Sequence, residues 1–245
     1  MDYSVSYHPI SEGQIKEWYF DVLEDLGAAE DLKLRITAEQ LDKNDNNLEE
    51  LEAYYKKKYL DMIKRSRDLD YGNFNKWHAY FIAVVQGFFE KFYFVHGSSL
   101  SSVHDLAFHK TYFTPWTEVS PADYIEDLDV NSKLQGPYSG GAYMSAAQVK
   151  QLLNDYENDS EIKDILDEQF EGKRVEVLLA ALKYASDNDQ GLVEAAKVIH
   201  PGEELFEEPL CYSNLFNCDV LSAAVYTKDL ADQYDAIYKG TGDDG

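Results

Sequence analysis

The sequence predicts an α+β fold: a predominantly helical single domain with a small β-sheet. Apolar residues recur at helical spacing through much of the chain, most regularly across residues 48–69. Short apolar or alternating runs typical of strands occur at residues 3–7 and 220–226. No linker rich in Pro, Gly and Ser divides the chain, so we expect one domain over residues 1–239 and a disordered tail over residues 240–245.

The N-terminal region predicts a short strand followed by a helix. Tyr residues and Val5 alternate with serines over residues 3–7, a pattern typical of a half-buried strand that ends at Pro9. Ser11 and Gln14 have the spacing of a capping box, so a helix is expected to begin there and to end at Gly27.

The helix predicted over residues 48–69 carries the basic island of the chain. Its outer face holds six cationic side chains: Lys56, Lys57, Lys58, Lys64, Arg65 and Arg67. Acidic residues on the same segment balance them, which favours a solvated helix face. A small anion site is the alternative.

Residues 74–95 are dense in aromatic side chains and predict the central helix of the core. Residues 97–141 are the least regular stretch, broken repeatedly by Ser, Pro and Gly. Long irregular segments often carry function, so a site is sought there.

The last third of the chain predicts mainly helices. Ser145 with Gln148 forms a second capping box, and Ser160 is expected to cap the following helix. A helix over residues 175–185 follows, and residues 192–199 fit a helix or a strand. Residues 220–226 are predicted to pair with the N-terminal strand, and residues 228–238 to form a closing helix.

Charge gives the clearest functional restriction. The chain has 22 Lys and Arg against 46 Asp and Glu, a formal net charge of −24. Too few cations are present to build a footprint on a nucleic-acid backbone, and an anionic membrane surface would repel the protein. A basic protein partner would be attracted instead.

The termini and the cysteines predict a soluble cytoplasmic protein. The first ten residues lack the basic and apolar regions of a secretory signal, and the longest apolar run, residues 88–95, is interrupted by Glu90 and Lys91. Cys211 and Cys218 could pair, but two reduced thiols fit this compartment better. No phosphate-binding loop or dinucleotide fingerprint is present, so no cofactor is expected.

Few residues suggest catalysis. His78 upstream of His104-Asp105 is similar to the His…His-Asp…Asp pattern of metal-dependent phosphohydrolases, which makes these three residues weak metal candidates. His104 and His109 could also bind a metal, but they are five residues apart and do not have the i, i+4 spacing of helical metal ligands. Residues 136–141 are glycine-rich without a lysine, which favours a tight turn that places Tyr138 and Tyr143.

Two segments resemble a known family. Leu69-Asp70 with Asn75-Lys76-Trp77-His78, and later the segment from Ala142 to Val149, look like the bacterial YfbM-like family, a domain of unknown function. Asn75 stands where that family has Asp, and Ser145-Ala146 replaces Thr-Pro. The resemblance covers about half of the chain. It implies an α+β domain in which Trp77 and His78 lie near the loop before Ser145, and it implies no reaction.

Two functional hypotheses follow. The first is an acidic protein-binding module acting on a basic partner, as an immunity protein or a mimic of an anionic ligand does. Its candidate contacts are the run of acids over residues 157–171 and the loop acids Glu203, Glu204, Glu207 and Glu208. The second is a small-ligand-binding protein or metal-assisted hydrolase, with a pocket formed by Trp77, His78, Tyr138 and Tyr143. Burial of these aromatic residues in a core would count against the second hypothesis.

Overall fold

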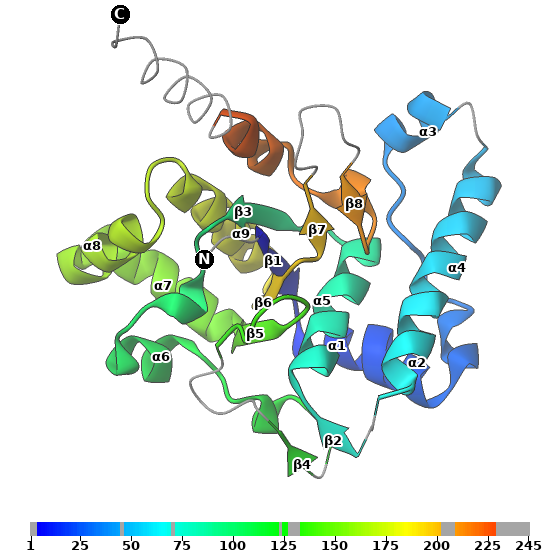
Figure 1. Cartoon of the computed structure of the whole chain (residues 1–245), viewed down its shortest axis with the longest axis horizontal. Coiled ribbons are helices and arrows are strands. Elements are labelled where there is room, and N and C mark those ends of the chain that lie inside the picture. Colours follow the sequence, from blue (N-terminus) through cyan, green and yellow to red (C-terminus); the bar gives the residue numbers. More distant parts are fainter. Residues whose placement is uncertain are drawn as a thin grey trace, which may run out of the picture.

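A four-stranded antiparallel sheet lies at the centre of the computed structural model, which describes residues 4–44, 47–69, 72–122, 124–126, 133–201 and 209–228 (Figure 1). The strand order is β3-β1-β6-β5. These strands are β3 (Tyr93–His96), β1 (Ser4–Ile10), β6 (Gly191–Ala196) and β5 (Gly140–Met144). With helices on both faces, this sheet confirms the predicted α+β class.

Strand β1 is buried along its whole length, so the prediction of a half-buried strand is wrong. It lies between β3 and β6, where Tyr7 is opposite both Tyr93 and Glu194. Val5 and Tyr7 face one core, whereas Ile10 faces the other. The small serines are compatible with burial because their hydroxyls find partners inside the fold, as that of Ser4 does by donating to the Ile199 carbonyl.

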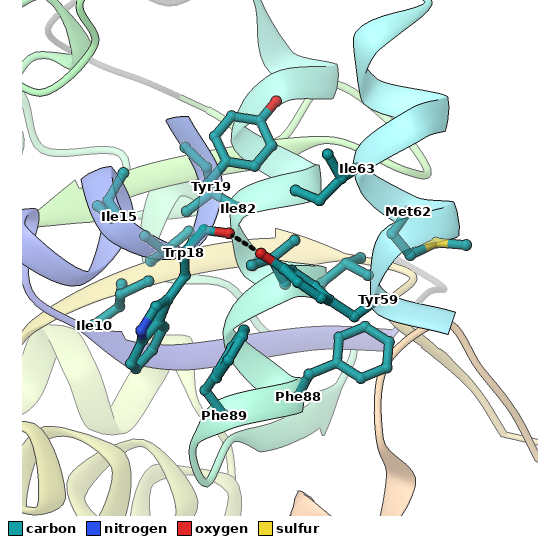
Figure 2. Packing of buried hydrophobic residues seen from close by; sticks show 14 of the residues in the cluster. Ile10, Ile15, Trp18, Tyr19, Tyr59, Met62, Ile63, Ile82, Phe88 and Phe89 are labelled. Carbon is teal, nitrogen blue, oxygen red and sulfur yellow. Dashed lines mark hydrogen bonds between the residues drawn. The ribbon is translucent and has the colours of Figure 1, made fainter. Parts of the chain in front are cut away.

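The helices on one face of the sheet enclose an aromatic core. They are α1 (Glu12–Ile15), the π-helical turn η1 (Lys16–Phe20), α2 (Asp21–Glu24), α4 (Leu48–Arg67) and α5 (Lys76–Phe89). Figure 2 shows Tyr59 of α4 donating a hydrogen bond of 2.7 Å to the Trp18 carbonyl, with Phe88 and Phe89 of α5 beside it. The outlying η2 (Leu26–Ala29) and α3 (Ala38–Asn44) complete this side.

A second helical layer covers the other face (Figure 1). It contains α6 (Leu106–Tyr112), α7 (Ala146–Asn158), α8 (Ser160–Gln169) and α9 (Arg174–Asp187). The predicted capping box is present at α7, where the Ser145 hydroxyl and the Gln148 side chain each accept from the other residue's backbone N–H. The cap of α8 is Asp159 and not Ser160, since its carboxylate accepts from the Glu161 N–H at 2.9 Å.

Short elements connect these layers. β2 (Asn73–Phe74) pairs in parallel with β4 (Tyr124–Ile125), and β7 (Ile199–His200) pairs antiparallel with β8 (Leu210–Cys211). Single 3-10 turns are formed by η3 (Leu100–Ser102), η4 (Trp116–Glu118) and η5 (Leu215–Asn217).

Two predicted elements are wrong. The helix predicted over residues 74–95 ends at Phe89, because Glu90 is extended and Tyr93–His96 pair with β1 as a strand. Residues 220–228 are helical, so the predicted strand over residues 220–226 does not exist. The turn before it favours a helix, because the Asp219 carboxylate accepts from the Leu221 N–H at 2.9 Å. The ambiguous segment at residues 192–199 is largely strand β6.

Both edges of the sheet are covered. The Phe92 N–H donates to Asn217 at 3.0 Å beside β3, and the Thr114 N–H donates to Tyr143 of β5 at 2.8 Å. The Trp116 indole N–H adds a bond of 3.0 Å to Gly141. Covered edges offer no template for pairing with another chain. Within the described part of the chain, no helix is both long and apolar enough to cross a membrane.

Candidate functional site

Trp77 and His78 are neighbours in sequence but face different environments. Both stand in the first turn of α5, which is capped by the Asn75 side chain accepting from the Trp77 N–H at 2.9 Å. Trp77 is 39% exposed, whereas His78 is 1% exposed and stacks on Phe74 at 5.4 Å between ring centroids. His78 Nδ1 accepts from the Asn75 N–H at 3.1 Å. His78 is therefore part of the capping box of α5.

Tyr138 and Tyr143 are also separated by burial. Tyr143 lies on β5 beside Trp116, at 5.7 Å between ring centroids, and burial raises the pKa of its phenol. Tyr138 is partly exposed, has a left-handed backbone with φ of 59°, and packs against His200 and Tyr212.

The four predicted pocket residues thus divide into two pairs. Phe74 and Trp116, at 5.2 Å, connect His78 to Tyr143 inside the first core, whereas Trp77 and Tyr138 reach the surface. None of the four lines either of the two grooves described below. Helix α5 does pack on β5, so His78 lies close to the strand that precedes Ser145.

The weak metal candidates lie in different parts of the fold. His104 and Asp105 are exposed before α6, whereas His78 is buried in the first turn of α5. The Asp105 carboxylate caps α6 by accepting from the Ala107 N–H at 2.6 Å and the Phe108 N–H at 3.3 Å. Among the residues that the structure describes, no group of three or more His, Cys, Asp or Glu is arranged to hold a metal ion.

The two cysteines are free thiols. Both pack against a small cluster formed by Phe92, Phe94 and Ile199. Burial raises the pKa of Cys211 to about 11 and raises that of Cys218 further. Thiols are nucleophilic only as thiolates, so this environment is unsuited to catalysis.

Sequence reasoning missed a buried carboxylate, Glu194, at the centre of β6. Its oxygens accept from the backbone N–H of Leu100 at 2.7 Å and of Ser101 at 3.2 Å, and from the Tyr7 hydroxyl at 3.3 Å. Burial raises the pKa of Glu194, while hydrogen bonds from Ser101, Ser99 and Leu100 oppose that shift. A lone Glu between Leu192-Val193 and Ala195-Ala196 was the available signal. Through these hydrogen bonds the carboxylate holds the η3 turn against β6 of the sheet.

A buried histidine was missed as well. His8 is fully buried on β1 and stacks on Phe92 at 5.1 Å between ring centroids. Its Nδ1 lies 2.8 Å from Gln86 Oε1, and its Nε2 lies 2.8 Å from the Ser6 hydroxyl. Because Gln86 Oε1 can only accept, Nδ1 carries the proton. Burial lowers the pKa of His8 to about 3, so the ring is neutral and structural.

Two of the six cations of the basic island on α4 support the fold directly. Lys56 donates to the carbonyls of Ala29 and Leu32, and Arg67 donates to the carbonyls of Leu23 and Glu24. Lysines and arginines used in this way hold the α2–η2 segment against α4. This arrangement favours a structural role over the small anion site.

The acids of α8 form an exposed face. Residues 155–171 contain eight acids and one cation, Lys163, for a local charge of −7. Glu161, Asp164 and Glu168 are exposed and follow the i, i+3, i+7 spacing of one helix face, opposite the buried Leu166. We call these three residues the α8 acidic face. The predicted contacts Glu203, Glu204, Glu207 and Glu208 lie outside the described residues.

Two surface grooves lie near acidic residues. The first, of about 610 Å³, separates the segment 97–105 from the end of α8 and the start of α9. It is lined by Gly97, Ser98, Val103, His104, Asp105, Ile165, Glu168, Gln169, Glu171 and Arg174. The second, of about 570 Å³, separates the segment 30–34 from α4 and is lined by Glu30, Asp31, Leu32, Lys33, Leu34, Glu49, Glu52, Ala53 and Lys56. We call the second one the α4 groove.

Comparison of the chain with protein-family models, with curated proteins and with solved structures gives no match.

Proposed function

We propose that the protein is a binding module for a basic protein partner and that the α8 acidic face is its principal contact. The observation that carries the proposal is the placement of Glu161, Asp164 and Glu168 on one exposed helix face within a segment of charge −7. A single-sign surface of this kind steers an oppositely charged partner and speeds association.

The position of α8 supports this role. The helix lies at the periphery, where it packs mainly against α7 (Figure 1). The three side chains of the α8 acidic face are exposed. The only cation of the segment, Lys163, pairs with Asp167, which also accepts from the Tyr156 hydroxyl at 2.8 Å. Lys163 is therefore turned toward Asp167 and does not neutralise the α8 acidic face.

The test is affinity capture with the full chain as bait, followed by identification of the bound proteins. The triple variant E161Q/D164N/E168Q removes the α8 acidic face. The control E12Q/D42N/E118Q removes the same charge at three exposed, scattered carboxylates. We expect a basic protein to be captured by the wild type and the control but lost from the α8 variant. Capture should also weaken with added salt.

Identical capture by both triple variants would show that α8 is not the contact. Capture of acidic or neutral proteins alone would contradict the proposed partner class.

A further inference from the structure

The α4 groove combines apolar side chains with a rim of carboxylates. Leu32 and Leu34 are half-buried and pack against the first core, and the exposed Ala53 completes the apolar lining. The four carboxylates of the rim are exposed: Glu30, Asp31, Glu49 and Glu52.

One wall of the groove is a regular helix face. Glu49, Glu52, Ala53 and Lys56 follow the i, i+3, i+4, i+7 spacing on α4, while Leu51 and Tyr55 of the same helix are buried. The other wall is the segment 30–34, whose Leu32 N–H is bonded to Ala29 at 3.2 Å. Both walls are formed in the free protein, so a ligand need not order them.

Lys56 is the second cation of the lining, but its ammonium is held between the two walls. Its ammonium donates to the carbonyls of Ala29 and Leu32 and so braces the two walls together. Burial lowers the pKa of Lys56, although Asp31, Glu30 and Glu52 oppose that shift. Lys33 is then the one exposed cation against four exposed carboxylates in the lining. The groove is therefore complementary to a cationic segment with apolar side chains.

We propose that the α4 groove docks an amphipathic basic segment of the partner, with its apolar side chains against Leu32, Leu34 and Ala53 and its lysines or arginines at the carboxylate rim. The inference rests on the proposed function and adds a second contact to it. Apolar contacts in a groove supply affinity and selectivity that long-range charge attraction does not.

The test uses two fluorescein-labelled peptides and the full chain. One peptide alternates Lys and Leu in an amphipathic pattern, and the other has every Leu replaced by Ser. We expect the Lys–Leu peptide to bind at least about 5-fold more tightly than the Lys–Ser peptide in a fluorescence anisotropy titration.

The matched variants place a large side chain inside or outside the groove. Ala53→Arg fills the apolar lining, and Ala53→Gln fills it without a charge. Ala224→Arg makes the same Ala-to-Arg replacement at an exposed helical residue outside the groove. We expect Ala53→Arg to lower the affinity for the Lys–Leu peptide about 10-fold and Ala53→Gln to lower it several-fold. Ala224→Arg should lower it less than about 2-fold. Circular dichroism checks that each variant is folded.

Equal weakening by Ala53→Arg and Ala224→Arg would overturn the inference, as would equal affinity for the two peptides. If E161Q/D164N/E168Q abolishes peptide binding while Ala53→Arg does not, the α4 groove is excluded and the proposed function stands. Failure of the wild type to bind either peptide at low salt would overturn both.

Discussion

Two polar residues, His8 and Glu194, are buried in the interior of the protein. His8 and Glu194 lie on adjacent strands, with His8 facing the cluster of Phe92 and Glu194 fastened to η3. Their environments shift their pKa values in opposite directions, down for His8 and up for Glu194. A buried base and a buried acid of this kind give the fold a pH dependence that the surface charge does not predict.

His8 should make the fold acid-sensitive. Its pKa is about 3 in the folded state, below the ordinary value of 6.5, so the unfolded chain binds the proton first. The stabilisation that comes from a neutral His8 is fully present above its ordinary pKa of 6.5, and it is lost as the pH falls toward its folded-state pKa of about 3. As the pH falls from about 6 to about 4, the free energy of unfolding of the wild type should decrease by up to about 1.4 kcal/mol per pH unit more than that of His8→Gln.

The measurement is urea unfolding at several pH values. The matched control is His104→Gln, at an exposed histidine, which should keep the wild-type slope. Parallel curves for wild type and His8→Gln would mean that His8 does not titrate on unfolding.

The cysteines should be slow to react in the folded protein. Burial raises the pKa of Cys211 from 9.0 to about 11, which lowers the thiolate fraction near neutral pH about 100-fold. We expect iodoacetamide to label neither cysteine appreciably until urea unfolds the chain, as followed by mass spectrometry. The single variants Cys211→Ser and Cys218→Ser assign the sites, and rapid labelling of either native thiol would contradict the expected burial effect.

At the scale of elements, two capping boxes were predicted correctly from local spacing, whereas strand pairing was not. The capping boxes at Ser11 and Ser145 begin helices as predicted, because a cap involves residues only three apart. Residues 220–226 are apolar enough for a strand, but β1 already has β3 and β6 as partners. The cap at Asp219 and the occupied edges of β1 together favour a helix in that apolar segment.

The predicted pocket was limited in the same way, because sequence spacing does not show which distant elements pack together. The sequence spacing of Trp77, His78, Tyr138 and Tyr143 could not tell that His78 and Tyr143 would be buried while Trp77 and Tyr138 reach the surface. Burial depends on α5 packing against β5 and on Phe74 and Trp116, which lie between His78 and Tyr143. The acids of α8 were predictable as one exposed face, because helical spacing alone places them together.

The contact between α5 and β5 should tolerate no added side chain at Gly140. A Cβ there would lie 2.4 Å from the Ala79 Cβ and 2.6 Å from the Ala79 carbonyl carbon. We expect Gly140→Ala to lower the free energy of unfolding by about 2 kcal/mol or more, since backbone atoms must move.

Gly13→Ala is the control within α1, where the nearest atom to the added Cβ is Ser11 Oγ at 3.8 Å. It should raise stability by about 0.5–1 kcal/mol through helix propensity. Equal stability of the two variants in urea unfolding would show that α5 and β5 are less closely packed than described.

The whole molecule carries its charge unevenly. The acids of α7 and α8 and those around the α4 groove lie on different helical layers, one on each side of the sheet (Figure 1). A partner that used both would have to extend around the molecule, or two basic segments would have to bind separately.

A net charge of −24 should also make the fold more stable when salt is added. Like charges repel in the compact state, and the screening length falls from about 30 Å at 0.01 M salt to about 8 Å at 0.15 M. Exposed ion pairs such as Lys16–Asp21 and Lys150–Asp189 weaken over the same range, but such pairs contribute little. We therefore expect the free energy of unfolding in urea to rise with NaCl.

The triple variants test where that repulsion arises. E161Q/D164N/E168Q should reduce the salt-dependent gain more than E12Q/D42N/E118Q, because carboxylates three and four residues apart on one helix face repel most strongly. Sucrose, which does not screen charge, serves as the control for general solute effects. A loss of stability with NaCl would mean that the ion pairs outweigh the repulsion, and equal effects of the two triple variants would mean that α8 is no more strained by charge than the rest of the surface.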